Sequence, residues 1–355
     1  VTVHVSVAEE NFERAFGFGH LLVPPNWVLK LYDQITQNYM LYSRYPTNGV
    51  DRMDKYLLPE NDGLATRDSG AWAKDKLFYL QKYINTFETS MQGKPWRRRI
   101  YIDLFSGPGK CKIKGSNEYF LGSSLLSLTA THPFTDYYFV DTEKDNINAL
   151  NTRSAATKVN QNRINFLIGD ANKKVFDIVD EIKKIDDKFI AGAWPSLNLA
   201  FLDPEGFELE WNTVAELATI NRMDLIIHYS QQGVKRMADR ALASNKETAI
   251  DKFFGDVEWR KIYSECKDDT TGIHRPLIDY YKSKLKALGY IEVKDDEEVW
   301  AEPLMKNRKN APLYRLLFAS KNSLGVKFWK DVTKIGVGGQ MSLWSTCLAS
   351  ESRIL

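Results

Sequence analysis

The sequence predicts an α/β fold built around a mostly parallel sheet. Three features indicate this fold: short apolar runs alternate with helical patterns from residue 99 onward, several runs end in an acidic residue, and the first ends in a glycine-rich turn. Strands that alternate with helices are typical of βαβ units, in which helices cover both faces of the sheet. Ligands of such sheets bind at the carboxyl ends of the strands.

Composition places the chain among ordinary globular proteins. Its 355 residues carry 48 Lys and Arg against 46 Asp and Glu, so the formal net charge is +2. This balance excludes a dominant acidic tail and does not by itself indicate nucleic-acid binding. The three cysteines, Cys111, Cys266 and Cys347, are too widely spaced for a disulfide framework or a zinc motif. We therefore expect a reducing cytoplasm. No apolar run reaches the length of about 18 residues that a membrane helix needs.

Residues 1–70 lie ahead of the alternating pattern and mix polar, glycine and proline residues without a sustained period. We interpret them as an appended, loop-rich segment. Residues 68–70 have the character of a helix start. Apolar residues at helical spacing then predict an amphipathic helix over residues 71–90.

Five apolar runs follow, each short enough to be a strand and each separated from the next by a helical pattern. The expected strands are Ile100–Phe105, Tyr137–Val140, Ile164–Ile168, Leu197–Leu202 and Leu225–Tyr229. The expected helices between them are Ser123–Thr131 and segments around Ile147 to Leu150, Val175 to Ile182 and Val214 to Ala218.

The remainder of the chain is expected to close the sheet. Residues 233–289 are mostly helical, and two further strands are expected at about 290–303 and 312–319. No helical pattern separates these two strands, so we expect them to pair antiparallel. A parallel core closed by an antiparallel strand pair is the outline of the Rossmann-like class I S-adenosylmethionine-dependent methyltransferase fold. The expected divisions are an appended segment 1–70, a core 71–240, a helical insertion 241–289, closing strands with a C-terminal helix 290–345, and a tail 346–355.

The first strand ends in the most informative motif, Asp103-Leu-Phe-Ser-Gly-Pro-Gly109. Glycines there let the backbone approach a ligand without a Cβ in the way. Neither the P-loop nor the dinucleotide-binding pattern fits, because the required glycine and hydroxyl positions hold other residues. The alternative is an ordinary turn at a strand end. We assign cofactor contacts to Asp103, Phe105, Ser106, Gly107 and Gly109.

The next two strands also end in carboxylates. Asp141, with Glu143 as second choice, follows the second strand, where a carboxylate can bind both ribose hydroxyls of a nucleoside. Asp170, followed by Ala171, ends the third strand and would face an adenine amino group. The alternative for each acid is a helix cap.

The fourth strand delivers Asp203 and Pro204 at its carboxyl end. The carboxylate and a backbone carbonyl fixed by the proline would accept hydrogen bonds from an exocyclic amine. Gly206 occupies the position where amine methyltransferases carry a stacking aromatic residue, which leaves Phe207 for that role. The alternative is a rigid turn that begins a helix. We interpret His228, on the fifth strand, as a core residue, and Cys111 as structural. No histidine or acidic spacing indicates a metal site.

Basic residues are concentrated locally rather than over the whole chain. They interleave with aromatic residues, so they could meet the phosphates of RNA or DNA. The alternative is a solvated basic face. The residues concerned are Lys94, Arg97, Arg98, Arg99, Lys110, Lys112 and Lys114.

Together these motifs resemble the three-Cys-motif partner family (TcmP) over about residues 71–345. The matching stretches are Lys76-Leu77 with Leu80 and Tyr83, Tyr101–Gly109, Gly122–Ser124, Phe139–Asp141, Phe201–Gly206, Phe253–Gly255 with Trp259, Pro312–Tyr314, Phe318–Ser320 and Gly339-Gln340. The resemblance implies a methyltransferase-like fold, a bacterial setting and a radical-type partner protein that carries three cysteines. The Asp-Pro-x-Gly loop also looks like that of the tRNA guanine-26 dimethyltransferase.

One departure from common methyltransferases concerns Lys110–Leu121, which separates the glycine turn from the next helix. The cofactor's carboxylate is therefore expected at the backbone amides of Gly122–Ser124, and we assign cofactor contacts to Gly122 and Ser123. The leading hypothesis is an S-adenosylmethionine-dependent methyltransferase that acts on an exocyclic amine of a nucleic-acid base. The alternative is a non-catalytic S-adenosylmethionine-binding or scaffold subunit that partners a three-Cys-motif protein.

Overall fold

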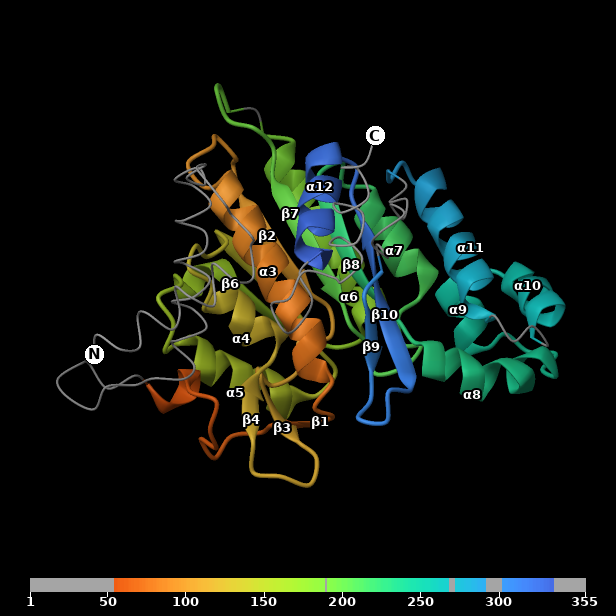
Figure 1. The fold of residues 1–355 in the computed structure, drawn as a ribbon. Coiled ribbons are helices and arrows are strands. Elements are labelled where there is room, and N and C mark those ends of the chain that lie inside the picture. The colour runs from red at the N-terminus through yellow and green to blue at the C-terminus, as the bar shows by residue number, and fades with distance from the viewer. Residues whose placement is uncertain (1–53, 189, 268–271, 292–301, 335–355) are drawn as a thin grey trace, which may run out of the picture. The chain divides into compact units, whose positions relative to one another are not determined.

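A seven-stranded sheet organises the part of the chain that the structure, a computed structural model, describes: residues 54–188, 190–267, 272–291 and 302–334. The strand order is β6-β5-β2-β7-β8-β10-β9 (Figure 1). The strands are β2 (Arg99–Asp103), β5 (Asp136–Asp141), β6 (Ile164–Ile168), β7 (Leu197–Leu202), β8 (Met223–Tyr229), β9 (Leu304–Lys306) and β10 (Pro312–Ala319). Neighbouring strands pair in parallel along the series β6, β5, β2, β7 and β8. Strand β10 is antiparallel to both β8 and β9. This topology confirms the predicted methyltransferase fold.

Helices cover both faces of the sheet, because alternate strand residues enter two separate cores. In β2, Ile100 and Ile102 belong to one core and Tyr101 to the other. The helices on the Tyr101 face are α3 (Ala73–Met91), α4 (Ser123–Leu128), α5 (Lys144–Ser154) and α12 (Ser323–Thr333). The helices of the other core are α6 (Ala171–Asp186), α7 (Trp211–Ala218), α8 (Gln231–Leu242), α9 (Ala249–Phe254), α10 (Glu258–Cys266) and α11 (His274–Ala287). Figure 1 shows α3 and α12 on the near side of the sheet.

A second sheet, of three strands, shows that two predictions were wrong: the loop after the glycine turn and the helix start at residues 68–70. Strands β3 (Lys110–Ile113) and β4 (Tyr119–Leu121) form an antiparallel hairpin, and β1 (Arg67–Ser69) pairs with β3 in parallel. The stretch after the glycine turn is therefore a hairpin rather than a loop. Residues 67–69 form a strand rather than the start of a helix, because they pair with residues 111–113 of β3.

A buried network of ion pairs attaches the segment before α3 to the rest of the described chain. We call residues 54–69 the strap; it includes a short 3₁₀ helix, η1 (Lys55–Leu57), and β1. Asp62 forms ion pairs with Lys110 at 2.8 Å and with Arg153 at 2.7 Å, and all three side chains have no exposed area. The Lys110 ammonium also donates to the Lys55 carbonyl at 2.9 Å. Lys110 is therefore structural and is not part of a phosphate-binding surface, contrary to the prediction.

Most of the predicted elements are confirmed, including the helix over 71–90, which is α3. Of the predicted strand at 290–303, residues 292–301 lie outside the described part, as do residues 1–53 and the tail. Among the described residues, no helix combines the length and apolar character that crossing a membrane requires. The same residues contain no cluster of His, Cys, Asp or Glu that could hold a metal ion.

Candidate functional site

The glycine turn at the end of β2 adopts a conformation that only glycine takes without strain. Gly107 has φ +59° and Gly109 has φ +90°. A Cβ at Gly109 would also lie 2.9 Å from Leu150 and 3.0 Å from Leu125. Arg153 donates to the Pro108 carbonyl at 2.6 Å, so the buried ion network holds the middle of the turn.

Asp141, at the end of β5, is hydrogen-bonded to this turn. Its Oδ2 accepts from the Gly107 N–H at 3.0 Å, and its Oδ1 accepts from the Glu143 N–H at 2.8 Å and the Asn146 amide at 3.1 Å. The Ser106 N–H donates to the Val140 carbonyl at 2.9 Å. The ends of β2 and β5 thus form one hydrogen-bonded unit, as expected for neighbouring parallel strands.

Asp103, the last residue of β2, is fully buried with an incomplete set of partners. Its Oδ1 accepts from the Phe105 N–H at 3.2 Å, and its Oδ2 has no hydrogen-bond partner among the described residues. Burial raises the pKa of Asp103 to about 7, and the nearby Ser123 side chain and the Phe105 N–H offset this rise only in part. A buried carboxyl with a free oxygen is poised to accept a cationic or N–H group.

Asp203, at the end of β7, is paired with a cation that sequence reasoning missed. Lys76 of α3 forms an ion pair with Asp203, and the side chains are 14% and 11% exposed. Burial would raise the pKa of Asp203, but the cations Lys76 and Arg67 hold it below its usual value. Asp203 is therefore a carboxylate at neutral pH. The apolar face of α3 was visible in the sequence, whereas the direction of its Lys76 was not.

His228 lies beside this pair near the end of β8. Its ring is 4.4 Å from the Tyr314 ring, centroid to centroid, and its Nδ1 has no partner among the described residues. Burial lowers the pKa of His228 to about 4, so the ring is neutral at pH 7. The prediction of a core histidine holds for its burial, but its position next to Asp203 was not foreseen.

Arg67, from strand β1 of the strap, is the second cation that the sequence did not indicate. Its guanidinium pairs with Glu205 at 2.8 Å, and its Cδ lies 4.0 Å from where a Cβ of Gly107 would be. Burial lowers the pKa of Arg67, but Asp203, Glu205 and Asp141 outweigh this and raise it. Arg67 therefore brings positive charge to the glycine turn between the ends of three strands.

Several predicted site residues have other roles. Phe207 is buried in the core against Phe253, with ring centroids 5.2 Å apart, so it is not placed to stack on a base. The Gly122 N–H donates to the Gly109 carbonyl at 2.7 Å and is not free for a ligand. The causes differ: Phe207 packs against a residue of a later helix, whereas Gly122 continues the pairing of the β3–β4 hairpin.

The third-strand residues lie at the same edge of the sheet but outside this network. Asp170 is exposed and caps α6, accepting from the Asn172 N–H at 2.9 Å. Ala171 is buried at the start of that helix. Glu143 is exposed just before α5, whereas Pro204 and Ser123 are buried beside Asp203 and the glycine turn respectively. The helix-cap interpretation of Asp170 is thus realised in the structure.

The predicted basic cluster is divided between the two ends of the sheet. Lys94 precedes β2 at its amino end, whereas Lys112 lies in the hairpin that follows the glycine turn at the carboxyl end. Arg98 pairs with Asp136 at 2.6 Å and Arg99 with Glu88 at 2.7 Å. Lys114 follows β3, and Arg97 donates to a backbone carbonyl. These residues therefore do not form one continuous basic surface.

Cys111 is not a reactive thiol. Burial raises the pKa of Cys111 to about 11, and the nearby cations Arg67 and Lys76 do not offset this. At neutral pH the sulfur is protonated, and the thiolate is the nucleophilic form. The structural interpretation of Cys111 agrees with its place in β3.

Comparisons with known proteins give fold-level similarity alone. No family model matches this chain, and no curated protein matches it; the resemblance to the three-Cys-motif partner family therefore has no support from them. The structure of TYW2 from M. jannaschii in complex with AdoMet is 8% identical, with 70% of this chain and 76% of that chain covered and a TM-score of 0.33.

Two further solved structures are similar at the same level. Trm1 from Pyrococcus horikoshii with S-adenosyl-L-methionine is 9% identical, with coverage of 74% and 58% of this and that chain and a TM-score of 0.34. Magnesium protoporphyrin IX methyltransferase from Synechocystis with bound SAH is 11% identical, with coverage of 84% and 100% and a TM-score of 0.33. At these scores the similarities carry no argument about reaction or substrate.

Proposed function

We propose that this chain is an S-adenosylmethionine-dependent methyltransferase that acts on an exocyclic amine of a nucleic-acid base. The observation that carries the proposal is the joined carboxyl ends of β2 and β5. There a glycine turn with positive φ angles is hydrogen-bonded to Asp141, next to a buried Asp103 whose Oδ2 has no described partner. In this fold a nucleoside ligand binds at the carboxyl ends of the strands.

The residues at this edge fit the chemical groups of S-adenosylmethionine. Asp103 would accept from the ammonium of the methionine part, and Asp141 would accept from the ribose hydroxyls. Asp170, at the end of β6, would face the adenine. Arg67, which lies against Gly107, is the cation that would meet the carboxylate. Bound in this way, the cofactor would supply a methyl group activated by its sulfonium.

Asp203 is the residue that would act on the acceptor. As a carboxylate it accepts a hydrogen bond from an amine N–H, which favours attack by the nitrogen lone pair, and it stabilises the positive charge that develops on nitrogen. The nitrogen would form its bond to the methyl carbon while the carbon–sulfur bond breaks and its electron pair stays on sulfur, and the nitrogen would then lose a proton. Asp203 would accept that proton and release it to solvent. Most of the rate enhancement would come from positioning.

A transfer assay with a labelled methyl group tests the reaction. We expect the purified chain to label unmodified RNA or DNA, with the label on an exocyclic nitrogen after digestion to nucleosides. Asp203→Asn is the control that should bind cofactor and not transfer. Cofactor binding without transfer to RNA, DNA or protein would contradict catalysis and favour the non-catalytic alternative.

A further inference from the structure

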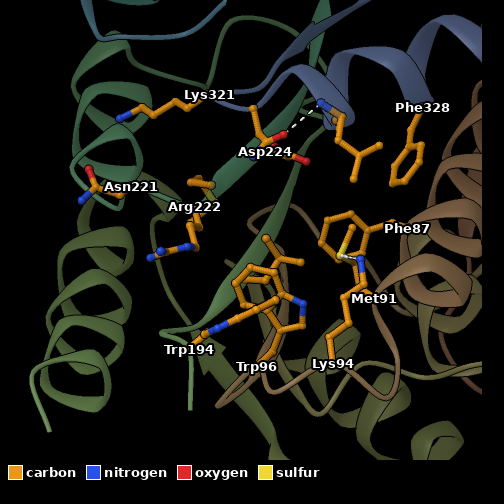
Figure 2. A pocket seen from close by; sticks show the side chains of 15 residues that line it. Phe87, Met91, Lys94, Trp96, Trp194, Asn221, Arg222, Asp224, Lys321 and Phe328 are labelled. Carbon is orange, nitrogen blue, oxygen red and sulfur yellow. Dashed lines mark hydrogen bonds between the residues drawn. The ribbon is translucent and has the colours of Figure 1, made fainter. Parts of the chain in front are cut away.

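The opposite edge of the sheet holds a cavity that is remote from the glycine turn. It has a volume of about 310 Å³, within the range of small-molecule sites, and lies among the amino ends of β7 and β8, the end of α3 and the start of α12. Figure 2 shows Trp96 and Trp194 together at one end of the pocket and Asp224 and Phe328 toward the other.

The two indoles are fixed by the backbone rather than by loose surface packing. Their ring centroids are 4.7 Å apart with planes at 74°. The Arg97 N–H donates to the Trp194 carbonyl at 2.9 Å, and the Trp194 N–H donates to the Pro95 carbonyl at 2.7 Å. Trp194 is nevertheless 45% exposed, so part of an indole face remains open. A rigid, open aromatic face is a surface on which a planar ring stacks.

Cations without acidic partners flank these rings. The Arg222 guanidinium lies 5.9 Å from the Trp96 ring centroid, and Figure 2 places it above the two indoles. Neither Arg222 nor Lys94 forms an ion pair with any residue in the described part of the chain. Among the described residues, the hydrogen-bond partner of the Lys94 ammonium is the Met91 sulfur, at 3.8 Å. Uncompensated positive charge beside an aromatic face favours an anionic aromatic ligand.

The inner end of the pocket supplies a hydrogen-bonding group. The Asp224 carboxyl lines the cavity and accepts from the Tyr83 hydroxyl at 2.7 Å. Burial raises the pKa of Asp224 to about 6, so both ionisation states are accessible near neutral pH. A carboxyl of this kind accepts from an amino or imino group of a base. An acidic peptide fits this end of the pocket less well, because the Asp224 carboxylate would repel the carboxylates of the peptide.

We propose that this pocket binds a nucleotide unit, with the base stacked on Trp194 and the phosphate held by Arg222. The unit is either a free mononucleotide or one nucleotide of a single-stranded chain. The site is independent of the methyltransferase proposal, because its residues lie at the amino ends of the strands whose carboxyl ends carry Asp103 and Asp203.

Calorimetric titration of the full chain tests the proposal with adenosine 5′-monophosphate, adenosine and a ten-nucleotide single-stranded RNA as probes. We expect the monophosphate to bind, adenosine to bind more weakly, and Trp194→Ala or Arg222→Glu to weaken binding about tenfold or more. The matched controls Phe176→Ala and Lys261→Glu, exposed residues of α6 and α10, should bind normally. Tighter binding of the RNA than of the monophosphate identifies a strand, and the reverse identifies a free nucleotide.

The Asp141→Ala variant distinguishes nucleotide binding at the amino edge of the sheet from binding at the carboxyl edge. Because adenosine monophosphate resembles part of the proposed cofactor, it should lose binding in Trp194→Ala and keep it in Asp141→Ala. The proposal is overturned if neither nucleotide probe binds at millimolar concentration. It is also overturned if the Trp194 and Arg222 variants bind as the wild type does, or if an acidic aromatic peptide binds there and nucleotides do not.

Discussion

The two edges of the sheet carry opposite kinds of groups on the same strands. The carboxyl edge gathers the carboxylates Asp103, Asp141 and Asp203, with Lys76 paired to the last of them. The amino edge gathers aromatic rings and the cation Arg222, which has no ion-pair partner in the described chain. The difference teaches that the charged groups at the carboxyl edge are buried or paired within the protein, whereas Arg222 and Trp194 at the amino edge are exposed. Each edge can therefore be perturbed separately.

The largest expected effect is on stability at the carboxyl edge. Asp62→Asn removes the charge that compensates the fully buried Lys110 and Arg153. Leaving such cations uncompensated costs about 3–5 kcal/mol of the free energy of unfolding. Urea denaturation followed by circular dichroism measures the change.

The matched control is Glu118→Gln, which breaks the exposed pair with Lys74. We expect it to change the free energy of unfolding by about 1 kcal/mol or less. Equal effects of the two substitutions would mean that the strap is not anchored by the buried network.

The next effect is on turnover. Asp203→Asn keeps the shape of the side chain and removes its charge, so methyl transfer should fall roughly 10²–10³-fold, the scale of losing one group that stabilises developing charge. Cofactor affinity should stay within about threefold, because Asp203 is assigned to the acceptor. Steady-state kinetics and calorimetry on the same preparation check both. Loss of cofactor binding would place Asp203 in the cofactor site instead.

Asp141→Ala should act in the opposite sense. It removes the acceptor of the Gly107 N–H and the proposed partner of the ribose hydroxyls. We expect cofactor binding to weaken by about 2–3 kcal/mol, the scale of lost hydrogen bonds to a charged group. Glu143→Ala is the matched control and should bind normally, because this exposed neighbour forms no side-chain hydrogen bond or ion pair within the described part of the chain. If the two variants bind cofactor equally, the ribose assignment is wrong.

A smaller effect concerns cofactor affinity, which should change gradually with pH. The pKa of Asp103 is about 7, so the carboxylate fraction in the free protein falls as the pH falls below 7. Cofactor affinity should then drop by up to about tenfold per pH unit, because the ammonium needs the ionised acid. Above about pH 8 the ammonium of the cofactor begins to lose its own proton, and affinity should fall again.

The Asp103→Asn variant tests whether Asp103 is the group whose titration lowers cofactor affinity at acid pH. Affinity should be lower and the acid limb of its pH profile should disappear. Because the folded pKa of Asp103 lies above the unfolded one, this group makes the folded state less stable as the pH rises from about 4 to 7. The asparagine variant without ligand should therefore gain stability relative to the wild type near pH 8. An unchanged acid limb would exclude Asp103 as the titrating group.

The sequence predicts the carboxyl edge better than the amino edge for a physical reason. Asp103, Asp141 and Asp203 each end an apolar run, so a parallel sheet brings them to one edge. Arg67 arrives through the pairing of β1 with β3, which no local pattern shows. The amino-edge pocket joins Trp96 and Trp194, which belong to different loops, so only the folded sheet reveals their contact.

The same distinction explains the errors. Lys110 follows a glycine turn and has the sequence character of a surface residue, yet it is buried because Asp62 of the strap faces it. Phe207 follows a predicted active-site loop, yet it packs on Phe253 from a later helix. In each case a long-range partner decided the outcome, and local residue types carried no signal of it.

The most direct test of the account is calorimetric titration of the wild-type chain with S-adenosylhomocysteine, with circular dichroism confirming that the protein is folded. The account predicts binding of one equivalent, unchanged in Trp194→Ala and unaffected by saturating adenosine 5′-monophosphate at the amino edge. No heat at millimolar ligand would contradict it, as would binding that is lost in Trp194→Ala.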